Sequence, residues 1–124
     1  MARLAAGAAA AWLVAAAGVA GAGCEVATAP PANARLLAPL PSYQAWWSEV
    51  EACSGLTGDE QRVAWYEVPA DPDDGGFYCA DGPDHTCAGE WAEPHSIYFA
   101  GPSTSFPKGY FSDEWTVKHE MLHD

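Results

Sequence analysis

Residues 115–124 read WTVKHEMLHD, and this stretch decides both the expected fold and the expected chemistry. It contains the pattern HExxH, with His119 and His123 four residues apart and Glu120 directly after the first histidine. Residues four apart lie one turn apart on the same face of an α-helix, so both imidazoles can reach one metal ion. The stretch therefore predicts a helix that carries a two-histidine metal site.

The residues before the motif predict where this helix begins and which face it buries. Ser112 is a suitable N-cap, and the carboxylates of Asp113 and Glu114 favour the positive end of the helix dipole. At about 100° per residue, Thr116 shares one arc with the motif residues. We expect this polar arc to face a cleft and the apolar residues to pack on a sheet. These apolar residues are Trp115, Val117, Met121 and Leu122.

A zinc ion at this position would give the glutamate a chemical task. Bound Zn²⁺ lowers the pKa of a water ligand and polarises a carbonyl group. Glu120 lies beside both histidines, where it can take a proton from that water and pass it to a leaving amine. Zn²⁺ is therefore the expected cofactor, with His119 and His123 as its ligands and Glu120 as the catalytic general base.

The sequence HEMLH, preceded by Val117 and Lys118, resembles the active-site helix of the zincin metallopeptidases. The resemblance covers about one helix, and it implies hydrolysis of peptide bonds in a peptide or protein substrate. A catalytic zinc needs three protein ligands. The resemblance therefore implies a third ligand, His or Glu, after Asp124, and a chain that is incomplete at its C-terminus. His85 and His95 are the upstream alternatives for that ligand.

Three upstream segments follow the order of elements in the first half of a zincin domain. Residues 42–53 (SYQAWWSEVEAC) repeat apolar residues at helical spacing, and Gly55 ends this helix. Residues 62–69 and 95–101 are rich in aromatic and β-branched residues, which favours strands. The expected fold class is α+β and zincin-like, with helices packed on a small mixed sheet. The resemblance assigns residues 97–100 as the edge strand that aligns the substrate.

Between the two predicted strands, residues 70–93 are dense in Gly, Pro and Asp and predict a long loop. Asp71, Asp73 and Asp74 alternate partly like calcium ligands. Gly75, however, stands where a calcium loop needs a third alternating oxygen ligand. We therefore expect a solvated turn at this point.

The four cysteines are Cys24, Cys53, Cys79 and Cys87. In an exported chain, cysteines form disulfides more often than metal sites. Cys79 and Cys87 close a short loop and are the preferred pair, and Cys53 is a further disulfide candidate. A metal cluster of Cys79, His85 and Cys87 is the alternative, although its spacing matches no zinc ribbon or knuckle.

The N-terminal residues 1–23 have the layout of a secretory signal peptide, with Arg3, a run of Ala, Leu and Val, and then small residues. We therefore expect an exported protein. Residues 20–22 fit a small-x-small cleavage site, which predicts secretion. Residues 21–24 (GAGC) instead resemble the lipobox of bacterial lipoproteins, which predicts lipidation of Cys24 and membrane attachment at the cell envelope.

The expected domain organisation follows from these boundaries. Residues 24–41 are rich in Ala and Pro and predict a tether, while residues 42–124 form a partial zincin-like domain that ends in the HExxH helix. Leu36, Leu37 and Leu40 could equally dock on that domain.

The charge limits the class of partner. Without residues 1–23, 4 Lys and Arg remain against 17 Asp and Glu, for a net charge of −13. Such a surface repels nucleic acid and anionic lipid headgroups, so nucleic acid is not an expected partner. Two other hypotheses stay open: a non-catalytic, disulfide-stapled envelope lipoprotein or binding module with an inert motif, and a scaffold held by structural zinc or disulfides.

Overall fold

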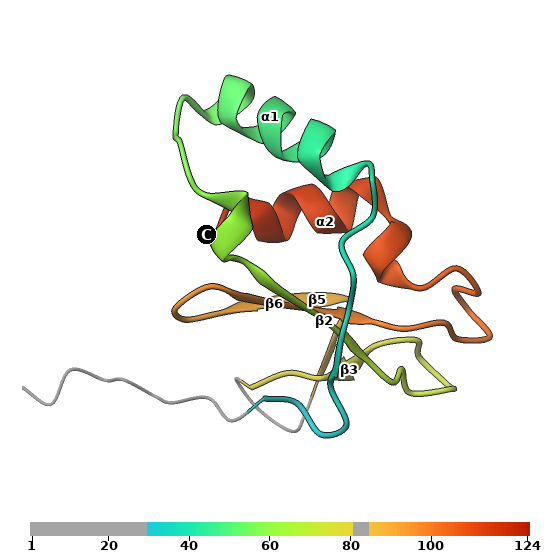
Figure 1. Cartoon of the computed structure of the whole chain (residues 1–124). Coiled ribbons are helices and arrows are strands. Elements are labelled where there is room, and N and C mark those ends of the chain that lie inside the picture. Colours follow the sequence, from blue (N-terminus) through green and yellow to red (C-terminus); the bar gives the residue numbers. More distant parts are fainter. Residues whose placement is uncertain (1–29, 81–84) are drawn as a thin grey trace, which may run out of the picture.

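Two helices lie on one side of a small sheet in the computed structural model of this chain, which describes residues 30–80 and 85–124 (Figure 1). The expected α+β fold class is confirmed. The expected signal peptide at residues 1–23 and the lipidation candidate Cys24 lie outside the described residues. Within the described ranges, no helix is long and apolar enough to cross a membrane.

The sheet is built around the two segments with strand composition. A short 3-10 turn, η1 (Glu60–Arg62), leads into strand β2 (Ala64–Val68), which pairs in parallel with β6 (Ser96–Ala100). The antiparallel strands β1 (Arg35–Leu36) and β5 (Gly89–Ala92) are added at the two edges. The order is β1-β2-β6-β5, so the sheet is mixed, as expected.

Helix α1 (Tyr43–Ser54) forms where apolar residues recur at helical spacing. It ends at Gly55, which has a left-handed φ of 73° and donates its N–H back to the last turn of the helix. Tyr43 is fully buried and Trp47 nearly so. Cys53, on the same predicted apolar side, is exposed and is bonded to no other described cysteine.

Helix α2 (Glu114–Met121) begins with Asp113 rather than with the expected Ser112 as its N-cap. The Asp113 carboxylate accepts hydrogen bonds from the Thr116 backbone N–H at 3.0 Å and from the Thr116 hydroxyl at 2.7 Å. Ser112 ends the 3-10 turn η2 (Tyr110–Ser112), and its hydroxyl donates to a backbone carbonyl in that turn. A carboxylate both caps a free N–H and complements the helix dipole, which explains the shift by one residue.

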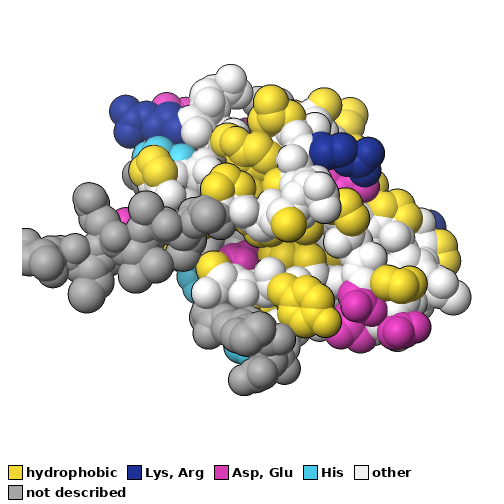
Figure 2. All heavy atoms as spheres, turned by 90° about the horizontal axis from the view of Figure 1, so that it is seen from below, with side chains coloured by type: hydrophobic (Ala, Val, Ile, Leu, Met, Phe, Trp, Pro, Cys, Tyr) yellow, Lys and Arg dark blue, Asp and Glu magenta, His cyan; other side chains and the backbone are white. Residues whose placement is uncertain are grey.

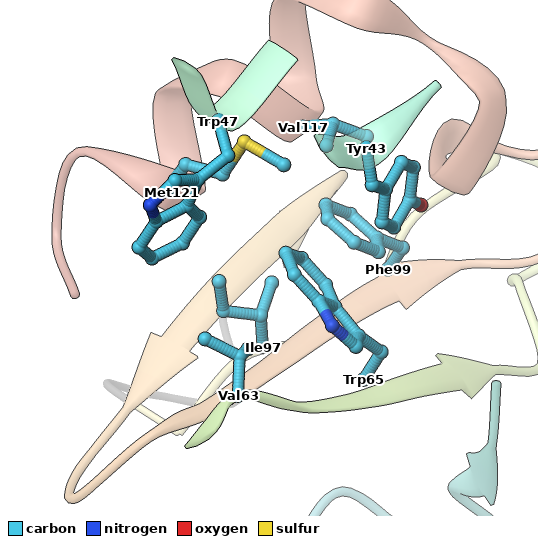
Figure 3. Close-up of a cluster of buried hydrophobic side chains, with 8 residues drawn as sticks. All are labelled: Tyr43, Trp47, Val63, Trp65, Ile97, Phe99, Val117 and Met121. Carbon is cyan, nitrogen blue, oxygen red and sulfur yellow. The ribbon is translucent and has the colours of Figure 1, made fainter. Parts of the chain in front are cut away.

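The main core lies between the two helices and the sheet. Figure 3 shows side chains from α1 and α2 pointing toward side chains of β2 and β6. The rings of Trp65 and Phe99 stack at 6.1 Å between centroids, and Tyr43 contacts Trp65 at 4.7 Å. The Tyr43 hydroxyl donates to the Phe111 carbonyl oxygen, and burial raises the pKa of this hydroxyl above its ordinary value. The core residues are Tyr43, Trp47, Val63, Trp65, Ile97, Phe99, Val117 and Met121.

A second, smaller cluster lies on the other face of the sheet. The side chains of β6 alternate between the two faces, because Ile97 and Phe99 join the main core while Tyr98 joins the second cluster. The rings of Tyr66 and Tyr98 stack at 4.9 Å. Seen from this side, hydrophobic side chains reach the surface beside acidic groups (Figure 2). Both faces of the central strands are therefore covered, but only one of them by helices.

The segment 70–93, expected to be a long loop, contains three short strands. Strands β3 (Phe77–Tyr78) and β4 (Thr86–Cys87) pair as a separate hairpin, and β5 follows directly. Cys79 and Cys87 form a disulfide with their Cα atoms 5.7 Å apart, which confirms the preferred pair. Strands of two to four residues leave too few positions for alternation to be recognised, so this part of the sequence prediction was wrong.

The acidic residues of this segment form a turn, as expected. The Asp71 carboxylate accepts the Asp73 N–H at 2.8 Å, and the Asp74 carboxylate accepts the Thr86 hydroxyl at 2.8 Å. These carboxylates are therefore bonded to the chain itself.

The segment ahead of α1 docks on the sheet. Leu37 and Leu40 pack against the main core, whereas Leu36, in β1, is 78% exposed. Of the two sequence alternatives for these leucines, docking thus holds for Leu37 and Leu40. Residues 24–29 of the expected tether lie outside the described residues.

Candidate metal centre

The imidazole rings of His119 and His123 lie next to each other on the exposed side of α2. Their Nε2 atoms are 3.4 Å apart, and their ring centroids are 5.1 Å apart. Two nitrogen ligands that bind one tetrahedral zinc at about 2.0–2.1 Å are themselves about 3.3 Å apart. The spacing of the two Nε2 atoms therefore fits one Zn²⁺ ion.

His123 lies just beyond the helix rather than inside it. The helix ends at Met121, and the next residues form a tightened turn in which the His123 N–H donates to the Glu120 carbonyl at 3.1 Å. The Leu122 N–H donates at 3.2 Å to the His119 carbonyl. Shortened bonds of this kind are a common way to satisfy the last groups of a helix. The turn keeps His123 close to His119 although the helix has ended.

The Glu120 side chain packs against the sheet, at Gly89. Glu120 is buried, with 6% of the residue exposed. A Cβ atom at Gly89 would lie 2.8 Å from Glu120 Cγ and 3.0 Å from Glu120 Oε1. Only a glycine at residue 89 leaves room for this carboxylate, which is therefore held against the first residue of β5.

The pKa of Glu120 is raised above its ordinary value. Burial is the largest cause, and the nearby Glu90 carboxylate also raises it, while His119 and the Trp91 backbone hydrogen bond lower it. A carboxylate with a raised pKa is a stronger proton acceptor, which is the property that a general base requires.

This raised pKa predicts how stability depends on pH in the metal-free chain. The folded state binds the Glu120 proton more tightly than the unfolded state, so the stabilising contribution is present below the unfolded pKa and is lost as the pH rises through the folded pKa. Glu120→Gln cannot ionise. We expect its melting temperature at pH 7 to exceed that of the wild type by a few degrees, on the order of the effect of 1 kcal/mol.

Scanning calorimetry between about pH 4 and pH 7 measures this difference, which should shrink toward the acidic end. Leu56→Ala serves as the control: Leu56 is 66% exposed and cannot ionise, so the difference between this variant and the wild type should not change with pH. A variant at residue 120 that is less stable than the wild type at pH 7 would contradict a cost of ionisation at this position.

A cleft lies between the motif helix and the start of β5. It has a volume of about 300 Å³, and His119 and Glu120 both line it. The remaining lining residues are Cys87, Ala88, Gly89, Trp115 and Thr116. Thr116, His119 and Glu120 of the expected polar arc therefore line one cleft, whereas His123 of the same predicted arc does not line it.

The edge strand beside the motif helix is β5, not residues 97–100. Strand β6 lies between β2 and β5 and is bonded on both sides, so it has no free edge. Within the described residues, β5 pairs with β6 alone. The assignment of residues 97–100 as the substrate-aligning edge strand is therefore wrong. The error arose because Gly89–Ala92 has no β-branched residue to mark it as a strand.

Two of the apolar residues of α2 do not pack on the sheet. Val117 and Met121 are buried as expected, but Trp115 is 80% exposed and Leu122 is 53% exposed. They line an apolar groove of about 530 Å³ between α1 and α2, together with residues that include Val50. The helix is only eight residues long, and its buried face is narrower than the apolar set predicts.

Neither upstream histidine completes the site. His95 Nδ1 lies 3.0 Å from the Asp124 carboxylate. Among the described residues, the one group of three potential ligand atoms is that of Cys79, His85 and Cys87, within 4.8 Å of one another. Both sulfur atoms of this group belong to the disulfide, so they offer no thiolate. This alternative metal cluster could hold a metal only after reduction.

Comparisons with protein-family models, with curated proteins and with solved structures find no match to this chain. The resemblance to zincins therefore rests on the HExxH motif and stays a prediction. Sequence reasoning missed the roles of Gly89, Trp91 and Asp124 at this site. The only signal in the sequence was the position of Asp124 next to His123.

Proposed function

We propose that this chain carries the zinc-binding helix of an exported, zincin-like metallopeptidase. The observation that carries the proposal is the 3.4 Å spacing between the Nε2 atoms of His119 and His123, which fits two ligands of one zinc ion. His119 and His123 are the proposed ligands, and Glu120 is the proposed general base. The proposal places the third ligand outside the described residues.

The chain's own groups have separate tasks in this proposal. Bound zinc would supply a Lewis acid that polarises the scissile carbonyl and acidifies a water molecule. Glu120, buried beside Gly89 and with a raised pKa, accepts the water proton and passes it to the leaving amine. Strand β5 is the edge strand beside the motif helix, and the proposal places an extended peptide substrate along it, next to Glu120.

Export belongs to the same proposal. The disulfide between Cys79 and Cys87 supports it, because disulfides persist in oxidising compartments and are rare in the cytosol. The disulfide is equally compatible with secretion and with lipid anchoring through Cys24, so both remain part of the proposal.

A binding module is the second candidate function, and one observation favours it. The groove between α1 and α2 exposes Trp115 and Leu122, and exposed apolar surface of this kind often marks an interaction site. In that case the two histidines would bind no zinc. The metal titration below therefore separates the two candidates.

Zinc binding to the metal-free chain tests the proposal directly. We expect one Zn²⁺ per chain by isothermal titration or by competition with a chromophoric chelator. His119→Ala and His123→Ala should each weaken this binding at least about tenfold, because each removes one of the ligands of the site.

His85→Ala is the matched control, because His85 lies outside the proposed site and belongs to the alternative cluster with the disulfide. It should leave zinc affinity unchanged. If the chain binds no stoichiometric zinc, or if His85→Ala weakens binding as much as His119→Ala, the proposed centre is excluded.

A further inference from the structure

Asp124 places a buried carboxylate directly after the second histidine of the motif. Its side chain is only 2% exposed. The Oδ1 atom accepts a hydrogen bond from the Trp91 indole Nε1 at 3.1 Å and lies 3.0 Å from His95 Nδ1. One carboxylate oxygen is thus held by two side chains that are about thirty residues away along the sequence.

These two partners come from one hairpin, which joins β5 to β6. Trp91 belongs to β5, and His95 directly precedes β6. A buried carboxylate is costly unless it is hydrogen-bonded, and hydrogen bonds to a charged acceptor are stronger than those between neutral groups. The contacts of Asp124 therefore tie the end of the motif segment to the edge of the sheet.

Asp124 is the direct neighbour of His123, the one motif histidine that lies outside helix α2. The helix ends at Met121, so His123 is held only by a turn, and residues just past a helix end tend to fray. On one side of His123, its N–H is bonded to the Glu120 carbonyl at 3.1 Å. On the other side, the buried side chain of Asp124 fixes the chain to the hairpin.

We infer that Asp124 is a positioning residue for the candidate metal centre: it holds His123 beside His119 and fixes both to the hairpin that contains the edge strand β5. The inference rests on the proposed function for the identity of the metal, but the positioning itself is a property of the metal-free chain. It also gives Trp91 two contacts with the site, since its backbone bonds the Glu120 carboxylate and its indole bonds Asp124.

The metal-free chain gives the first test, by NMR. In the wild type we expect nuclear Overhauser contacts between the ring protons of His119 and His123, and an indole N–H resonance of Trp91 typical of a hydrogen-bonded group. Asp124→Ala should lose the ring contacts and shift the Trp91 resonance. Asp124→Asn keeps an oxygen acceptor of the same shape, so it should retain both signals.

Zinc affinity gives the second test. Removal of groups that orient metal ligands typically weakens metal binding by about 10- to 100-fold, which is the loss expected for Asp124→Ala. Asp124→Asn should restore the affinity to within about threefold, and Trp91→Phe should fall between the two, because it removes one of the two contacts. Urea unfolding of each variant, without metal, measures the change in global stability alongside.

The outcomes separate this inference from the proposed function. If Asp124→Ala lowers stability but keeps the histidine ring contacts and wild-type zinc affinity, Asp124 has a structural role only and the inference is overturned. An Asn variant as weak as the Ala variant also contradicts it, because the acceptor oxygen would then not be what matters. If the wild type binds no zinc while the ring contacts change as expected, the positioning stands and the metallopeptidase proposal falls.

Discussion

Under the proposed peptidase function, replacing Glu120 with Gln is expected to lower zinc-dependent peptide hydrolysis by about 10²- to 10⁴-fold, the range for loss of a general base. Gln has nearly the same shape, so the contact with Gly89 and the adjacent zinc ligands should be retained. The loss should appear mainly in kcat, because the proton transfer occurs in the transition state. Turnover of a quenched fluorescent peptide, together with metal content per chain, measures both quantities.

The matched control is Glu90→Gln. Glu90 is near enough to raise the pKa of Glu120. Of these two glutamates, however, only Glu120 lines the cleft beside His119. We expect this control to change kcat less than about tenfold, consistent with a change of charge near the base. Retained hydrolysis in Glu120→Gln with stoichiometric zinc would remove Glu120 from the mechanism.

Truncation of Phe99 to Ala is expected to lower the free energy of unfolding by about 3–5 kcal/mol. Phe99 is 0% exposed, stacks on Trp65, and meets the edge of Tyr43 at 6.3 Å. Its removal takes away contacts to strand β2 and to helix α1 at once. Since a small domain is typically stable by about 5–15 kcal/mol, the variant should be partly unfolded well below the denaturant midpoint of the wild type.

Urea unfolding followed by tryptophan fluorescence measures the difference. Leu56→Ala is a suitable control, because Leu56 is 66% exposed and its loss should change stability by less than about 0.5 kcal/mol. A cost for Phe99→Ala below about 1 kcal/mol would mean that β6 does not carry the main core.

The sequence predicts those helices and strands that are long enough for a regular spacing of apolar residues to be recognised. The spacing of Tyr43, Trp47 and Val50 predicts α1, and the alternation of Ile97, Tyr98 and Phe99 predicts both faces of β6. These signals arise because burial on one face selects apolar residues at regular intervals. The two helices and the central strands therefore follow from the sequence.

The missing parts depend on contacts between distant segments. Strand β5 lacks the β-branched residues that mark a strand in the sequence, and it is a strand because its backbone pairs with β6. Trp115, which is 80% exposed, lines the groove between α1 and α2, and the shape of this groove depends on how the two helices pack together. Similarly, nothing near Asp124 in the sequence indicates Trp91 and His95, which reach it only through the fold.

In the candidate site, too, local features could be predicted from the sequence, whereas features that depend on distant segments could not. The proximity of His119 and His123 follows from the sequence alone, because residues four apart come together across one helical turn. The surroundings of Glu120 do not, because the absence of a side chain at Gly89 matters only once β5 lies against α2. Local geometry could thus be predicted, whereas the environment that sets the pKa of Glu120 could not.

The disulfide between Cys79 and Cys87 belongs to the wall of the cleft beside the motif helix. Cys87 is both a partner of Cys79 and part of the cleft wall beside His119. A newly synthesised chain in a reducing compartment has this wall without its covalent link, and the link forms only where thiols are oxidised. Thiol reagents in a buffer would cleave this link and would also bind Zn²⁺ themselves, so the zinc titration is made without them.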